Sequence, residues 1–291
     1  MTKKIAVIND LSGFGKCSLT AAISVIAAMG VQPCPLPTAI LSAQTGYPSY
    51  FCDDYTDKMD HFRTEWKKMG AQFDGIYTGF MADSRQGEKI FSFLDTFYEK
   101  KTFLLVDPVM GDNGETYGIF TAELLQMMKE LVSRADIITP NLTELCLLTG
   151  TDYRMIEQMT DEKHLLTVTE QMSRNIMAKG PKEIVVTGIR FTDCEDGIQK
   201  MGNLAVTKES VNLKAFPFIG ESYSGTGDLF ASAIAGGRAR GDALADVMEL
   251  AGHMIELAIQ DSVKEHVPRN DGVNYEQYLW MLSKGIKGEG V

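Results

Sequence analysis

The sequence lacks any apolar run long enough to cross a membrane. Its longest nearly apolar stretch is Ala21–Val31, well below the roughly 18 residues that a spanning helix needs. Near the N-terminus, Lys3 and Lys4 precede only a short apolar run, too short for the core of a signal peptide. We therefore expect a soluble, cytoplasmic protein without a membrane partner.

Cysteine and histidine patterns typical of disulfide frameworks and zinc sites are also missing. The five cysteines are odd in number and widely spaced, and none forms a CxxC pair. The four histidines form no H-x-x-x-H pair. Reduced thiols in a cytoplasmic protein fit this pattern better than disulfides or a zinc site.

Basic residues are too few for a general anion-binding surface. The chain of 291 residues has 39 acidic and 28 basic side chains, a formal net charge of −11. This balance argues against nucleic acid and anionic membranes as partners, because both require clustered Lys and Arg. A phosphate-bearing substrate would therefore have to be attracted locally. Hydrophobic residues make up 44% of the chain, enough for a sizeable core, which excludes global disorder.

Short apolar, β-branched runs alternate along the chain with longer helical patterns. The predicted parallel strands are Ile5–Ile8, Gly75–Thr78, Thr102–Val106, Ala135–Thr139 and Glu183–Thr187. The predicted helices are Ser18–Met29, Ser84–Tyr98, Ala122–Val132, Glu162–Ala178, Thr226–Lys264 and Tyr275–Lys284. A hairpin is predicted from Gly202–Val206 and Val211–Phe216. This alternation indicates an α/β fold with a Rossmann-like, doubly wound, mostly parallel sheet and helices on both faces. Because no repeat or long polar linker interrupts it, we expect residues 1–291 to form a single domain.

Polar clusters follow the predicted parallel strands. They are Asn9–Gly15, Thr78–Gly79, Asp107–Asp112, Thr139–Glu144 and Thr187–Gly188. In open parallel sheets, ligands bind beyond the carboxyl ends of the strands. The sequence therefore predicts a binding site along one edge of the sheet.

The most specific segment is Gly225–Asp228, which precedes a predicted helix. Its glycines let backbone N–H groups approach an anion, and the positive end of the helix would face that anion. Asp228 fits two roles. It is either an ordinary helix-start carboxylate or an acid that takes a proton from a substrate hydroxyl attacking a phosphorus, and we favour the second.

Two acidic segments predict a magnesium–phosphate site. Asp107 and Asp112 bracket a Pro/Gly turn, and Mg²⁺ prefers hard oxygen ligands while retaining several waters. Asn141 and Glu144 lie three residues apart at a helix start, which equally fits a capping box. Their common sheet edge favours a shared metal–phosphate role.

Two loops are candidates for contact with the substrate. The segment Gly13–Ser18 matches neither a P-loop nor a dinucleotide fingerprint, because glycines are missing at the required positions. It is better interpreted as a substrate-contacting turn next to Ser12. The polar and aromatic segment Ala43–Tyr47 suits stacking on a flat ring, with a surface turn as the alternative.

These motifs, in this order, resemble the pyridoxal kinase family of the ribokinase-like superfamily. The resemblance runs from about Lys4 to the helix after Asp228. The Gly225–Asp228 motif is shared by the whole superfamily, whereas Thr45–Tyr47 and Asp107–Asp112 narrow the substrate to vitamin B6. The resemblance implies a homodimer that phosphorylates the 5′-hydroxymethyl group of pyridoxal, pyridoxine or pyridoxamine with ATP and Mg²⁺.

The resemblance also implies roles for individual residues. Asp228 would be the general base, beside an anion hole formed by Gly225, Thr226 and Gly227. The substrate-binding residues would be Ser12, Thr45, Tyr47, Phe80, Tyr117 and Asp228. The ATP-binding residues would be Asp107, Asn141, Glu144, Thr187, Gly188, Thr226 and Gly227. The residues around the metal would be Asp107, Asp112, Thr139 and Glu144.

The chain departs from the family at two positions. Phe80 stands where members often carry a tyrosine, and the loop Asp112–Tyr117 that would cover the site is short.

Other functions left open are a hydroxymethylpyrimidine or sugar kinase, and a catalytically silent B6-binding protein. An NAD-dependent oxidoreductase is disfavoured by the missing glycine fingerprint. The sequence leaves open the preferred vitamer and a requirement for K⁺.

Overall fold

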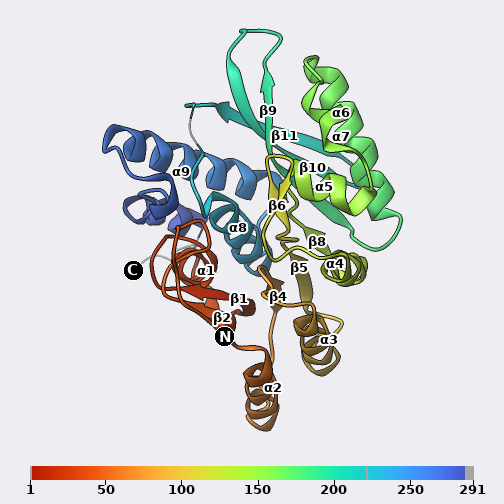
Figure 1. The fold of residues 1–291 in the computed structure, drawn as a ribbon, viewed down its shortest axis with the longest axis vertical. Helices are drawn as coiled ribbons and strands as arrows, with labels where there is room; N and C mark the ends of the chain where they lie inside the picture. Colours follow the sequence, from red (N-terminus) through yellow and green to blue (C-terminus); the bar gives the residue numbers. More distant parts are fainter. Residues whose placement is uncertain (1, 221, 286–291) are drawn as a thin grey trace.

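The computed structural model describes residues 2–220 and 222–285, and one central sheet organises them (Figure 1). In spatial order the strands are β11 (Val211–Pro217), β10 (Gln199–Thr207), β9 (Glu183–Thr192), β8 (Ile137–Ile138), β5 (Phe103–Val106), β4 (Gly75–Thr78), β1 (Lys4–Ser12), β2 (Gln32–Leu41) and β3 (Cys52–Asp54). The strands from β9 to β2 are parallel. At the two edges, β10, β11 and β3 run antiparallel to their neighbours. The predicted mostly parallel α/β sheet is confirmed.

Helices cover both faces of the sheet because successive strand residues point to opposite sides. Ile5 and Val7 of β1 pack on one layer of helices, and Ala6 and Ile8 pack on the other. The first layer contains α1 (Ser18–Ala28), α8 (Thr226–Arg240), α9 (Leu244–Lys264) and η3 (Glu276–Gly285). The second contains α2 (Met59–Lys68), α3 (Arg85–Phe97), α4 (Ala122–Arg134), α5 (Leu142–Thr149), α6 (Tyr153–Glu157) and α7 (Glu162–Met177). The loops that follow the parallel strands meet at the carboxyl edge of the sheet, between these two layers.

Strand β2 is not among the strands predicted from the sequence, since Pro33, Pro35 and Pro37 argue against a strand there. The strand forms because of where its N–H groups point. Gln32 donates its N–H to the carbonyl of Lys3, the residue before β1, so the alternating residues 33, 35 and 37 direct their nitrogens away from β1. On that outer side, β3 pairs only with Ala39–Leu41. The prolines therefore occupy positions at which the ladder requires no donor.

The predicted helices at the C-terminal end need two corrections. The helix Thr226–Lys264 is divided into α8 and α9, because Gly241 adopts a left-handed conformation with φ 89° and ends α8. The helix Tyr275–Lys284 is a run of 3₁₀ turns, η3. The segment between α9 and η3 contains a short 3₁₀ turn, η2 (Arg269–Asp271), which reaches the functional site.

No helix in the described part of the chain is both long and apolar enough to span a bilayer.

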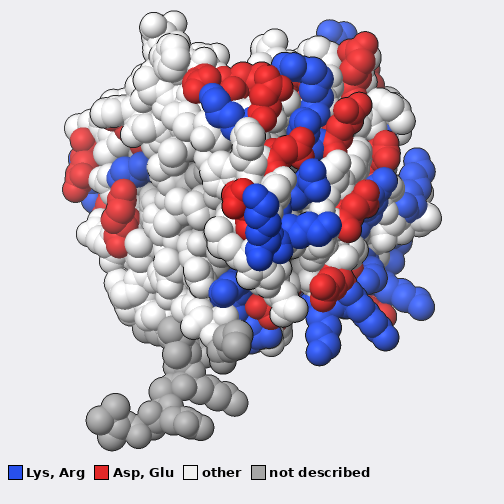
Figure 2. All heavy atoms as spheres, turned by 90° about the horizontal axis from the view of Figure 1, so that it is seen from below, with Lys and Arg blue, Asp and Glu red and all other residues white. Residues whose placement is uncertain are grey.

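Figure 2 shows one face of the molecule, on which Lys and Arg side chains are interspersed with Asp and Glu. Ion pairs neutralise some of the basic groups of α2 and α3, since Arg63 and Lys89 both pair with Asp60, at 3.1 and 2.6 Å. Such mixing offers no continuous basic surface on this face.

Candidate active site

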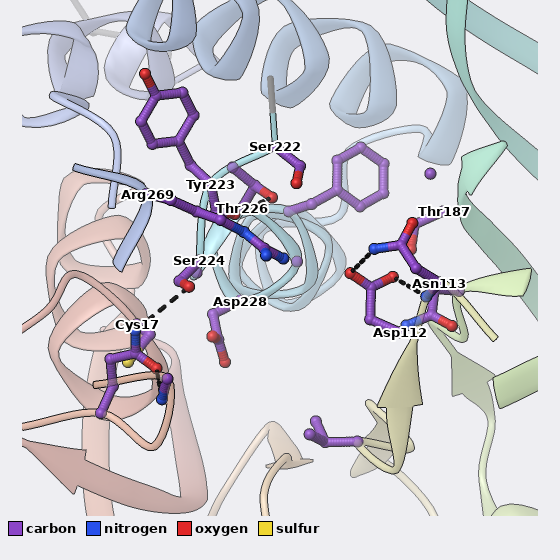
Figure 3. Close-up of a pocket in the computed structure, with 18 of the residues that line it drawn as sticks. Cys17, Asp112, Asn113, Thr187, Ser222, Tyr223, Ser224, Thr226, Asp228 and Arg269 are labelled. Atoms are coloured by element: carbon purple, nitrogen blue, oxygen red, sulfur yellow. Dashed lines mark hydrogen bonds between the residues drawn. The ribbon is translucent and has the colours of Figure 1, made fainter. Parts of the chain in front are cut away.

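A cleft of about 1370 Å³ lies along the carboxyl ends of the parallel strands. It brings together every residue that the sequence analysis assigned to a site: Ser12, Thr45, Tyr47, Phe80, Asp107, Asp112, Tyr117, Thr139, Asn141, Glu144, Thr187, Gly188, Gly225, Thr226, Gly227 and Asp228. Figure 3 shows Thr226 and Asp228 on one side of this cavity and Asp112 on another. The shared location is consistent with the predicted site, while the roles of these residues stay predictions.

The Gly225–Asp228 segment begins α8 and faces the cavity. Gly225 is the N-cap, with φ 85°, and a Cβ atom at this position would lie 2.1 Å from the Lys16 carbonyl oxygen. Only glycine tolerates both the backbone conformation and the close approach of α1's leading loop. The free N–H groups of the first turn and the helix dipole therefore point toward the cleft.

Asp228 lies in the first turn of α8, partly buried. Its carboxylate accepts hydrogen bonds from Asn9 Nδ2, at 3.3 Å, and from the Ser18 backbone N–H. Burial raises the pKa of Asp228 to about 6, the charge of Asp10 adds to this, and both hydrogen bonds oppose it. The group is thus ionised near neutral pH but more basic than an ordinary aspartate, as a general base should be.

Asn9 and Asp10, at the end of β1, contribute to the site although the sequence analysis did not single them out. Asn9 Oδ1 accepts the N–H groups of Asp10 and Phe80, at 3.0 and 2.8 Å, while its Nδ2 holds Asp228. Asp10 is buried, which raises its pKa, and accepts the Ser12 hydroxyl at 2.7 Å. Both residues directly follow the apolar run Ile5–Ile8, in the same polar cluster as Ser12, and this position alone marks them as site candidates in the sequence.

Asp107 directly follows β5 and carries a buried carboxylate. Thr139 Oγ1 donates to its Oδ1 at 3.0 Å. Burial raises the pKa of Asp107 well above its usual range, and the charge of Asp228 adds to the increase. No ion pair to Asp107 occurs among the described residues. A buried carboxylate without a cation is costly, so the cavity favours a bound positive charge at this point.

Asn141 and Glu144 form a complete capping box at the start of α5, so the local alternative is correct. Glu144 Oε2 accepts the Asn141 N–H at 2.9 Å, and its Oε1 accepts the Met110 N–H at 3.1 Å. Burial raises the pKa of Glu144, and the charge of Asp107 adds to this. The box also shapes the cavity, because Asn141 Nδ2 donates to the Gly111 carbonyl at 2.8 Å and fixes the loop after β5.

That loop continues into a small hairpin over the cavity, β6 (Gly111–Asp112) and β7 (Glu115–Thr116). The Asp112 carboxylate accepts two hydrogen bonds from Asn113, at 2.9 Å from the backbone and 2.8 Å from the side chain. Tyr117 follows the hairpin with 42% of its surface exposed. This position is compatible with the predicted cover of the site.

The remaining predicted residues lie at opposite ends of the cleft. Thr187 pairs with Asn141 across the sheet edge, and Gly188 follows it with φ 69°. At this end, Arg190 lies over the Phe218 ring, 4.6 Å from its centroid. At the other end, Tyr47 packs edge-on against Phe14, with ring centroids 5.9 Å apart. Thr45 is exposed and Phe80 is partly buried at that end.

Comparisons with known proteins agree with this geometry. A family model described as phosphomethylpyrimidine kinase matches residues 14–270. A solved Bacteroides thetaiotaomicron structure with pyridoxal has a TM-score of 0.88 at 34% identity, covering 97% of this chain and 96% of that one. The pyridoxal kinase of Lactobacillus plantarum has a TM-score of 0.83 at 27% identity, with 97% of each chain covered.

A curated relative extends the comparison to another organism. The pyridoxine/pyridoxal/pyridoxamine kinase of Bordetella avium is 25% identical over 280 residues, which is 92% of this chain and 90% of its own length. The likeness to pyridoxal kinases that the motifs indicated is therefore confirmed. Since the family model spans most of its length, the chain belongs to the phosphomethylpyrimidine kinase family.

Proposed function

We propose that this chain is an ATP-dependent kinase that phosphorylates the 5′-hydroxymethyl group of pyridoxal, pyridoxine or pyridoxamine. The observation that carries the proposal is Asp228, a carboxylate of raised pKa placed beside the free N–H groups that begin α8. The choice of a B6 ring is supported by the kinases named for these vitamers among the relatives, and by the related structure with pyridoxal.

In this reaction Asp228 takes the proton of the substrate hydroxyl while the hydroxyl oxygen attacks the terminal phosphorus of ATP. The bond from that phosphorus to the bridging oxygen breaks, and ADP leaves. The N–H groups of the Gly225–Gly227 segment stabilise the negative charge on the transferring phosphoryl group, aided by the dipole of α8. Asn9 orients the Asp228 carboxylate through its Nδ2. Closure of the hairpin and Tyr117 over the ligands would exclude water.

The donor set fits a magnesium ion bound with ATP. Asp107 is a buried carboxylate that lacks a cation among the described residues, and Asp112 lies on the same rim of the cleft. These two residues would hold the ion, directly or through its waters. Thr139 orients Asp107, and Glu144 fixes the loop between them, because both of its oxygens already accept backbone N–H groups. Magnesium would neutralise phosphate charge in this acidic cleft.

The quaternary state, ion requirement and compartment are also part of the proposal. We expect a homodimer, which molecular mass in solution would test. A requirement for K⁺ would be tested by replacing it with a larger organic cation in the assay. All five cysteines are unpaired, which supports a cytoplasmic enzyme.

The experiment is an assay of ADP release with Mg-ATP and a panel of the B6 vitamers, hydroxymethylpyrimidine and ribose. Turnover with at least one vitamer, exceeding that with the other acceptors, is expected. Tight binding of pyridoxal without ADP release would instead indicate a silent B6-binding protein and refute the proposal.

A second candidate is a hydroxymethylpyrimidine or phosphomethylpyrimidine kinase. The observation in its favour is the family model, whose description is phosphomethylpyrimidine kinase. A clear preference for the pyrimidine in the same panel would replace the B6 assignment, while leaving the roles proposed for Asp228 and the start of α8 intact.

A further inference from the structure

The short segment Pro268–Asp271 reaches the cleft from the chain between α9 and η3, and its backbone is tied to the start of α8. The Arg269 carbonyl accepts the Ser224 N–H at 3.1 Å. Ser224 immediately precedes Gly225, the N-cap of α8. This bond therefore fixes Arg269 next to the proposed anion hole.

The same segment is tied to the loop proposed to hold the substrate ring. Asn270 Nδ2 donates to the Gly46 carbonyl at 2.7 Å, and Gln44 Nε2 donates to the Asn270 carbonyl at 3.1 Å. Gln44 Nε2 also lies 3.3 Å from Ser224 Oγ, and Tyr47 donates its hydroxyl to Asp271. These contacts join three parts of the chain at the acceptor end of the cleft, opposite the end at which Arg190 covers Phe218.

Arg269 itself lines the cavity, and Figure 3 shows its side chain extending from this segment into it. No ion pair or side-chain hydrogen bond involves its guanidinium among the described residues. Three carboxylates of the cleft have other partners: Asp228 accepts a hydrogen bond from Asn9, Asp10 from Ser12, and Asp107 from Thr139. The guanidinium is thus a cation that enters an acidic cavity without being neutralised by it.

We propose that the Arg269 guanidinium binds the phosphoryl group on the acceptor side of the cleft, during its transfer and in the phosphorylated product. This inference rests on the proposed kinase function. A guanidinium matches phosphate oxygens with two parallel donors, which suits a planar fork held at a fixed backbone position. The hydrogen bonds of this segment to Gln44, Gly46 and Ser224 place the guanidinium at the end of the cleft where the substrate ring is proposed to bind. We therefore assign the guanidinium to the phosphate of the acceptor and not to the phosphates of the nucleotide.

The test compares the wild-type protein with Arg269→Gln, Arg269→Lys and, as a matched control, Arg154→Gln. Arg154 is exposed on α6 and lies outside the cleft, so its replacement changes the net charge equally. For each variant we would measure thermal unfolding, ADP release with pyridoxal, and the Kd values of pyridoxal 5′-phosphate, pyridoxal and ADP.

Arg269→Gln is expected to lower kcat/KM for pyridoxal, and to raise the Kd of pyridoxal 5′-phosphate, by about 10- to 100-fold, the range for hydrogen bonds to charged groups. The Kd values of pyridoxal and ADP should not change. Arg269→Lys should recover part of the loss, because Lys keeps the charge but not the fork, and Arg154→Gln should behave as the wild type.

An unchanged Kd for pyridoxal 5′-phosphate in Arg269→Gln would overturn the inference, as would an equal rise for pyridoxal, which indicates a structural role. A rise for ADP alone would also overturn it by moving Arg269 to the donor side. If the wild type released no ADP with any vitamer, the proposed function would fail. The Kd comparison of phosphorylated and unphosphorylated ligand would then still decide whether Arg269 binds phosphate.

Discussion

Replacing Asp228 by Asn is expected to change activity and stability in opposite directions. The amide has nearly the same shape and can still accept the hydrogen bond of Asn9, which spans 3.3 Å in the native site. It cannot take a proton from the substrate hydroxyl. The turnover number should therefore fall by about 10²–10⁴, the usual contribution of a positioned general base. This corresponds to a barrier higher by about 3–5 kcal/mol.

Stability should increase because the native carboxylate is strained electrostatically. Burial, with the charge of Asp10, raises the pKa of Asp228 from 3.8 to about 6 in the folded protein. The folded state binds the proton more tightly than the unfolded chain, so the wild type loses stability as the pH rises from 3.8 through about 6. At about 1.4 kcal/mol per pKa unit, the upper limit is about 3 kcal/mol. Partial exposure reduces this, and we expect a gain of about 1–2 kcal/mol for Asn at pH 7.

The two effects can be measured on the same preparations. ADP release across the pH range should show that the wild-type kcat/KM declines on acidification through about pH 6, since Asp228 must be ionised to act. The residual activity of the Asn variant should lack this decline. Urea unfolding at acidic and neutral pH should show that the variant's advantage is largest at neutral pH. Near wild-type turnover in the variant, or lost activity accompanied by lower stability, would refute the reasoning.

Other perturbations of the site have equally defined outcomes. Gly225→Ala should lower the free energy of unfolding by about 1–3 kcal/mol, because its Cβ would meet the Lys16 carbonyl at 2.1 Å in a left-handed backbone. Thermal unfolding checks this, with Gly227→Ala, whose Cβ would meet nothing within 4 Å, as the control that should unfold near the wild-type temperature. Asp107→Asn should raise the Mg²⁺ concentration for half-maximal activity about tenfold or more. The same variant should be slightly more stable than the wild type, because a buried carboxylate is removed. An unchanged magnesium titration would contradict the metal assignment. Chelation of Mg²⁺ in the wild-type assay should abolish ADP release and restoration of the ion should recover it, whereas activity persisting in excess chelator would show that the cleft does not need the ion.

Much of the fold follows from local patterns in the sequence. Apolar β-branched runs such as Gly75–Thr78 coincide with a strand, because a sheet covered on both faces requires such residues. The polar clusters at their ends meet in one cleft, because parallel strands bring their carboxyl ends to the same edge. Strand β2 could not be predicted in this way. A strand tolerates proline only where the proline nitrogen faces a side without a partner strand, and the local sequence does not show which side that is.

The parts of the site that were missed depend on contacts between distant segments. Asn270 and Gly46 are bonded across more than two hundred positions, and neither lies in a segment with helical or strand periodicity. Nothing in the sequence around Arg269 indicates that this segment, which comes after α9 in the chain, lies against the start of α8. Local chemistry thus identified the glycine-rich segment and its acids, whereas the segment that encloses them could be recognised only in three dimensions.

The three prolines of β2 also affect how this molecule meets its neighbours. Along residues 33–37 the outer side of the strand offers carbonyl acceptors but no N–H donors. A strand from another chain that docked there could form only half of its ladder, so this stretch is a poor template for aggregation. If two copies associate, a continuous sheet through this stretch of β2 is disfavoured.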